Sequence, residues 1–223
     1  MVLAWLALMV APWSAGAREP LDSAAWPWTA IGRVNVAGRA YCTGALVGPA
    51  TVLTAAHCLV RKVDGSFVAP DQVHFVAGYR RGEWLAHAVA MDVVHGDPKT
   101  GPAGDWALLE LRDALKIEPL KVDENPPSVG SALLRAAYDR DRPHLLSVDR
   151  DCRLTGVSGA VLLHDCAGLP GSSGAPLLRE TPDGPVVVGI VEGTAKVDGA
   201  VTGIAVGVAA FAEVLAQLSG KAR

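Results

Sequence analysis

Short apolar runs alternate with turn residues along most of the chain after Arg18. The runs are rich in Val, Leu and Ala, and Gly, Pro, Asp or Asn separate them about every ten residues. This spacing is typical of an all-β barrel or sandwich. Twelve runs are predicted to be strands: 28–36, 41–47, 51–54, 72–77, 86–94, 106–111, 131–137, 144–150, 160–164, 175–179, 186–192 and 203–207.

The C-terminal end carries the one helical pattern. Apolar side chains fall at i, i+3, i+4 and i+7 (Phe211, Val214, Leu215 and Leu218), and Gly220 supplies a stop. A stretch rich in Pro, Asp and Asn, 112–130, is the expected connection between two halves. We therefore predict two β domains, 18–112 and 113–223, that form one unit with a terminal helix.

Residues 1–17 have the pattern of a signal peptide. They carry no charge and end in the small residues Ala15-Gly16-Ala17. The apolar run is shorter than the ~20 residues that span a membrane. Cleavage after Ala17 would leave a secreted or periplasmic protein without a membrane anchor. No basic residue precedes the apolar run, so an uncleaved anchor or a start further upstream stays open.

Charge and cysteine content narrow the class of protein. The 20 basic and 23 acidic residues form no basic stripe, which argues against nucleic-acid binding. No Cys-x-x-C motif or histidine ligand spacing is present, so neither a metal nor a cofactor is expected. In an oxidising compartment, four cysteines favour the disulfides Cys42–Cys58 and Cys152–Cys166 among three possible pairings.

A candidate catalytic base is His57, in the segment Leu53-Thr54-Ala55-Ala56-His57-Cys58. The neighbouring cysteine would fix the imidazole, and a base must be held within hydrogen-bond reach of its nucleophile. Taken alone, a histidine beside a structural disulfide is the commoner interpretation.

Asp105 and Ser173 are the other two candidates. Asp105 opens an apolar strand, so its carboxylate is expected to be partly buried and to need a partner, although a solvated Gly-Asp turn is the simpler interpretation. Ser173 lies in Gly171-Ser172-Ser173-Gly174-Ala175, where small residues let backbone N–H groups approach a substrate. A plain loop between strands is the alternative there.

Together the three segments resemble those of the trypsin/chymotrypsin-like serine proteases. The similar runs are Cys-x-Gly-x-Leu-Val with Val-Leu-Thr-Ala-Ala-His-Cys, Asp-Trp-Ala-Leu-Leu-Glu-Leu and Gly-Ser-Ser-Gly-Ala-Pro-Leu, supported by Trp26-Pro27-Trp28 and Gly189-Ile190-Val191. The resemblance covers residues 26–218 and is closest to the short secreted bacterial members.

The resemblance implies two six-stranded antiparallel β-barrels with the active site between them. Ser173 would be the nucleophile, His57 the base, and Asp105 the group that orients the base. The backbone N–H groups of Gly171 and Ser173 would form the oxyanion hole. The substrate would be a protein or peptide, the enzyme a monomer, and no metal or cofactor would be needed.

Three features depart from the family pattern. Ser172 stands where animal members carry the Asp that pairs with a new N-terminus, so we predict no activation of that kind. The resemblance places Ala167 at the base of the specificity pocket, where Arg/Lys-specific members carry Asp, so a neutral pocket is predicted. Glu192, Gly193 and Thr194 would lie on the strand that lines it. Glu192 itself has three open interpretations: a pocket charge, a perturbation of Asp105, or a solvent-facing residue.

The run Asp139-Arg140-Asp141-Arg142 alternates acidic and basic residues. It lacks the ligand pattern of a calcium loop and is interpreted as a solvated hairpin.

The leading functional hypothesis is an exported serine endopeptidase acting through an acyl-enzyme. The alternative is a protease-like binding or scaffolding protein whose activity is absent or regulated.

Overall fold

The computed structural model describes residues 18–21, 24–37, 41–123, 125, 127–197 and 199–221. The expected signal peptide, 1–17, lies outside these residues. Within the described ranges, no helix has the length and apolar character required to cross a membrane.

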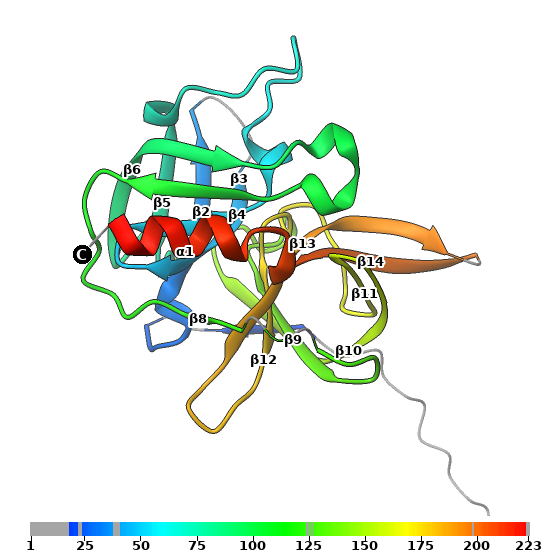
Figure 1. Ribbon diagram of the computed structural model, residues 1–223. Helices are drawn as coiled ribbons and strands as arrows, with labels where there is room; N and C mark the ends of the chain where they lie inside the picture. Colours follow the sequence, from blue (N-terminus) through cyan, green and yellow to red (C-terminus); the bar gives the residue numbers. More distant parts are fainter. Residues whose placement is uncertain are drawn as a thin grey trace, which may run out of the picture.

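Six strands of the N-terminal half close into an antiparallel barrel in the order β2-β3-β4-β7-β6-β5 (Figure 1). Inward positions are filled by Val, Leu, Ala and Phe side chains that are almost fully buried. Burial of such side chains removes apolar area from water at about 25 cal/mol per Å². The strands are β2 (Ile31–Val36), β3 (Tyr41–Gly48), β4 (Thr51–Thr54), β5 (Val73–Ala77), β6 (Ala86–His95) and β7 (Ala107–Leu111).

The C-terminal half contains a second ring of six antiparallel strands. The order β10-β11-β14-β13-β12-β9 closes because β9 also pairs with β10. The strands are β9 (Ala132–Ala137), β10 (Leu146–Ser158), β11 (Val161–His164), β12 (Pro176–Arg179), β13 (Val186–Val197) and β14 (Ala200–Gly207). The predicted fold class, two six-stranded β-barrels, is therefore confirmed.

Two short strands join the second barrel from elsewhere in the chain. β1 (Glu19–Leu21) pairs antiparallel with β10, and β8 (Lys121–Val122) pairs parallel with β13. The N-terminal segment thus crosses to the C-terminal barrel, and residues of the predicted connection add a strand to it. Neither short strand was predicted from the sequence, whereas all twelve predicted strands are present.

The helical elements are short, and the longest is α1 (Ala212–Lys221) at the C-terminal end. It begins directly after Phe211, the first apolar position of the predicted pattern, and follows one turn of 3₁₀ helix. It continues through Gly220 to Lys221, so the predicted stop at Gly220 was wrong. In Figure 1 α1 crosses in front of the first barrel, and Leu215 and Leu218 belong to a hydrophobic core that includes buried residues of both barrels. The 3₁₀ turns are η1 (Trp28–Ala30), η2 (Ala56–Leu59), η3 (Pro70–Gln72), η4 (Pro98–Thr100), η5 (Pro102–Gly104) and η6 (Val208–Ala210).

Candidate active site

His57 and Asp105 form a close pair at one end of the first barrel. His57 lies in η2, directly after β4, and Asp105 lies between η5 and β7. His57 Nδ1 is 2.5 Å from Asp105 Oδ2, and the His57 backbone N–H donates to Asp105 Oδ1 at 2.7 Å. Two contacts to one carboxylate fix the imidazole in position and orientation. Asp105 is only 2% exposed, as expected for a carboxylate that opens an apolar strand.

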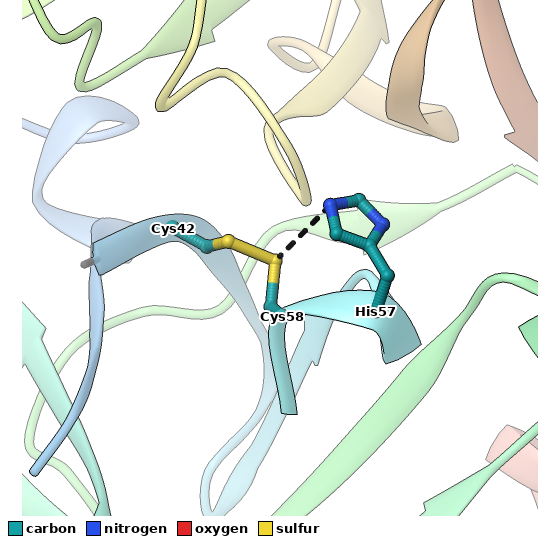
Figure 2. Close-up of side chains that lie close together, drawn as sticks. All are labelled: Cys42, His57 and Cys58. Carbon is teal, nitrogen blue, oxygen red and sulfur yellow. Dashed lines mark hydrogen bonds between the residues drawn. A yellow bond between two sulfur atoms is a disulfide. The ribbon is translucent and has the colours of Figure 1, made fainter. Parts of the chain in front are cut away.

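The disulfide beside His57 holds the segment that carries the imidazole. Cys42 of β3 is bonded to Cys58 of η2, with their Cα atoms 6.2 Å apart. Figure 2 shows the ring above this bond, with Nε2 3.8 Å from Cys58 Sγ. The second predicted disulfide, Cys152–Cys166, is also present. Each disulfide closes a loop of about 15 residues and stabilises the fold by roughly 3 kcal/mol in the chain-entropy model.

The environment of His57 favours the protonated imidazole. Burial alone lowers the pKa of His57, but the hydrogen bond and the negative charge of Asp105 raise it, and the charge of Glu192 raises it further. The net effect is a His57 pKa above its ordinary value. A base that gains affinity for a proton in this way is suited to accept one from a neighbouring hydroxyl.

Ser173 lies in a tight loop whose backbone conformation depends on glycine. Gly171 and Gly174 have φ values of +99° and +75°. A Cβ on Gly174 would lie 2.2 Å from Thr54 Oγ1 and 2.3 Å from the Thr43 carbonyl oxygen. The Ser172 N–H donates to Leu169, and the Gly174 N–H donates to Val191.

Within the described residues, the N–H groups of Gly171 and Ser173 donate to no protein acceptor. Two neighbouring free donors of this kind can bind an oxyanion. The Ser173 hydroxyl lies 3.5 Å from the carbonyl oxygen of Glu192. Among the residues that the structure describes, no hydrogen bond joins this hydroxyl to His57.

Thr43 connects the loop that carries Ser173 to the first barrel. Its backbone N–H donates to the Ser173 carbonyl at 2.9 Å, and its hydroxyl donates to the Gly171 carbonyl at 3.0 Å. The same hydroxyl accepts from the Tyr138 N–H at 3.0 Å. Because Thr43 follows Cys42 on β3, one short segment positions both the histidine and the serine. Nothing local in the sequence indicated this role.

A buried ion pair contacts the loop that carries Ser173, through the neighbouring Ser172. Asp139 accepts two hydrogen bonds from Arg135, at 2.8 and 3.0 Å, and one from the Ser172 hydroxyl at 2.6 Å. Arg18 donates to the same carboxylate at 2.8 Å. Burial raises the pKa of Asp139, but Arg135, then Ser172 and Arg18, lower it more, so the net pKa is below its ordinary value.

The interpretation of residues 139–142 as a solvated hairpin was therefore wrong for Asp139. Its side chain is fully buried, whereas its neighbour Asp141 is exposed and also pairs with Arg18. Charge alternation alone predicted solvent on all four residues. The missed signal was Arg135, a charged residue inside the apolar strand Ala132–Ala137, since a buried guanidinium requires a buried anion.

The residues predicted to line the specificity pocket lie on two segments. The Ala167 N–H donates to the carboxylate of Asp149. A Cβ added to Gly193 would have no heavy atom within 4 Å, so the space beside this residue is open. The Thr194 methyl group faces Gly168, since a Cβ there would lie 2.4 Å from it. Glu192 differs from the other three: its carboxylate lies near His57 and Asp105.

Ligand atoms of His57, Asp105 and Glu192 all lie within 4.8 Å of one another. Two of these groups, His57 Nδ1 and Asp105 Oδ2, already contact each other at 2.5 Å. The other cluster, Cys42, His57 and Cys58, has both sulfurs in a disulfide and offers no thiolate.

Known proteins are similar to this chain in sequence or in fold. Human Serine protease 23 is 28% identical over 160 residues, and the rat protein is 27% identical over 173 residues. Each alignment covers 60% of this chain but only 42% of the relative, so the chain spans about two fifths of the length of these relatives.

A solved Glu endopeptidase has the same fold, with a TM-score of 0.79, 16% identity, and coverage of 92% of this chain and 97% of that one. At this identity the likeness concerns the fold alone. The sequence model of the trypsin-like peptidase domain family matches residues 42–190, a range that includes all three candidate catalytic residues. The chain therefore belongs to the trypsin-like peptidase family.

Proposed function

We propose that this protein is an exported serine endopeptidase in which Ser173, His57 and Asp105 form the catalytic triad. The observation that carries the proposal is the pair of contacts from Asp105 to the ring and backbone of His57, at 2.5 and 2.7 Å. A carboxylate held this way selects the imidazole tautomer that leaves Nε2 free to accept a proton.

In the proposed reaction, Ser173 Oγ turns from the Glu192 carbonyl toward His57 Nε2 and attacks the scissile carbonyl carbon. The serine proton passes to Nε2, and the new oxyanion accepts hydrogen bonds from the N–H groups of Gly171 and Ser173. His57 then gives the proton to the leaving amine, and an acyl-enzyme remains. Water, deprotonated by His57, releases the acid and restores Ser173.

Hydrogen-bond geometry of unliganded enzymes often tightens only when substrate binds, which fits a serine that does not yet contact His57. Each oxyanion donor contributes ~2.7–4 kcal/mol to transition-state stabilisation. Gly171 is essential to this arrangement, since a Cβ there would lie 2.5 Å from the Tyr138 carbonyl oxygen.

The proposed substrate is a protein or peptide with a small or apolar side chain before the scissile bond, taken by a monomer. Ala167 supports a neutral pocket, and the open position beside Gly193 leaves space for a side chain. Export is supported by the apolar leader sequence and by two disulfides. Hydrolysis of a series of peptides that differ only at this side chain tests the pocket.

Labelling with a fluorophosphonate tests the proposed chemistry, because the probe bonds covalently to an activated serine. The parent protein is expected to be labelled, and Ser173→Ala is expected to be unlabelled. Ser158→Ala is a matched control, since Ser158 is exposed at the end of β10. Labelling that persists in Ser173→Ala would show that another residue is the nucleophile.

A protease-like binding protein is the second candidate. The contact of the Ser173 hydroxyl with Glu192, in place of His57, is the observation in its favour. A folded parent protein that neither reacts with the probe nor cleaves any peptide would support this candidate and exclude the peptidase.

A further inference from the structure

Glu192 occupies the one irregular position in the pairing of β13 with β14 near the candidate triad. Val191 pairs with Ala205 and Gly193 with Ile204, so Glu192 is an extra residue that forms a bulge. A β-bulge changes the direction in which a side chain points, and such bulges are common beside active sites. The bulge explains how an acidic residue on a barrel strand reaches the base.

Both the backbone carbonyl and the side-chain carboxylate of Glu192 face the proposed triad. Its backbone carbonyl accepts from Ser173 Oγ at 3.5 Å, and its carboxylate lies within 4.8 Å of ligand atoms of both His57 and Asp105. The side chain is only partly exposed, so water screens its charge incompletely. From this geometry we propose that Glu192 is a positioning residue of the triad, a second carboxylate that stabilises the protonated imidazole of His57 together with Asp105.

The charges that face His57 come from two elements. Asp105 precedes β7 and Glu192 belongs to β13, and the Cys58 sulfur at 3.8 Å carries no charge. Burial and the charge of Asp105 raise the pKa of Glu192, while His57 opposes this rise. The two carboxylates therefore repel each other while the imidazole is neutral, and both are stabilised when it carries a proton.

Protonation of His57 is the event that this arrangement favours. During acyl transfer the imidazolium is stabilised by two anions, which speeds the step at neutral and alkaline pH. In the free enzyme the same charges hold a proton on His57, which inactivates the base as the pH falls. Removal of the Glu192 charge is thus expected to slow the reaction in alkali and to protect it in acid.

The test compares Glu192→Gln with the parent by the rate of reaction with a small fluorophosphonate. This probe reports on Ser173 and His57 without filling the specificity pocket. The ratio of variant to parent rate is expected to be roughly two- to fivefold higher at about pH 5.5 than at about pH 8.5, the change that a partly screened ion pair gives. Glu180→Gln, which removes an exposed charge on the same hairpin, is expected to leave the ratio unchanged.

A double-mutant cycle with Asp105→Asn adds a second readout. If each carboxylate stabilises the imidazolium, the double variant is expected to react at about pH 8.5 more slowly than Asp105→Asn alone, by the same two- to fivefold factor that Glu192→Gln shows in the parent. A double variant that reacts as fast as Asp105→Asn alone would contradict the inference. Glu192→Asp retains the charge and is expected to retain the parent pH profile in part.

The inference rests on the proposed function, and the two fail in different ways. A parent protein that never reacts with the probe overturns the peptidase itself. A reactive parent with the same pH profile in Glu192→Gln overturns only the role of Glu192. A change in selectivity between basic and neutral peptides, without a change in pH profile, would assign Glu192 to the pocket.

Discussion

Replacement of Asp139 by Asn tests whether the buried ion pair supports the loop that carries Ser173. The change keeps the size of the side chain and removes its charge. Arg135, whose side chain is fully buried, then loses its only anion among the described residues, and the Ser172 hydroxyl loses a charged acceptor. An uncompensated buried charge is the main cost of breaking such a pair.

The expected loss of unfolding free energy is about 3 to 5 kcal/mol, the range measured when one partner of a buried pair is removed. Arg18 adds little, since its ion pair with Asp139 is partly exposed to water. With a urea slope of about 2 kcal/mol per M, the unfolding midpoint falls by roughly 2 M.

Acid reduces this difference between parent and variant. The folded-state pKa of Asp139 is lowered, so its charge stabilises the fold above the ordinary aspartate pKa. That stabilisation is lost as the pH falls through the folded-state pKa. The two proteins are therefore expected to differ fully at neutral pH and to converge below about pH 4.

Urea unfolding followed by tryptophan fluorescence measures the stability, and the fluorophosphonate rate reports on Ser173. Asp141→Asn is the matched control, because Asp141 pairs with the same Arg18 but is exposed, and it is expected to cost less than about 1 kcal/mol. Equal losses in the two variants would refute a buried, structure-determining role for Asp139.

Two further changes test the loop and the disulfide. Gly174→Ala is expected to abolish labelling of Ser173, because the added Cβ would lie 2.2 Å from Thr54 Oγ1. The control Gly159→Ala, at φ +57° with no atom within 4 Å of the added Cβ, is expected to keep the labelling. Full labelling of Gly174→Ala would contradict the close packing. The double change Cys42→Ala and Cys58→Ala is expected to cost roughly 3 kcal/mol in urea unfolding, and an unchanged midpoint would show that this bond does not constrain the unfolded chain.

Local patterns in the sequence were sufficient to predict the twelve strands of the barrels. Alternation and turn residues are properties of short segments, so β2 to β7 and β9 to β14 could be identified one at a time. β1 and β8 are too short to carry such a pattern. Their positions depend on β10 and β13, which lie far away in the sequence.

Within the candidate site, the sequence indicated residue types but not their contacts. His57, Asp105 and Ser173 stand in recognisable segments. Thr43 is a variable position of the Cys-x-Gly-x-Leu-Val run, and Asp139 belongs to a run that resembles a surface hairpin. The direction of the Glu192 side chain depends on a one-residue bulge. A register shift of this kind arises from pairing between strands and leaves no mark in either strand alone.

The contacts of Thr43 also constrain when catalytic competence can arise during folding. Its hydroxyl reaches the Gly171 carbonyl across 128 positions of sequence, and contacts so distant form late in folding. During synthesis the first barrel is complete before the ribosome has made the segment that contains Ser173. Under the proposed function, a nascent chain is therefore unable to cleave its neighbours, since Ser173 gains its position only when both halves are joined.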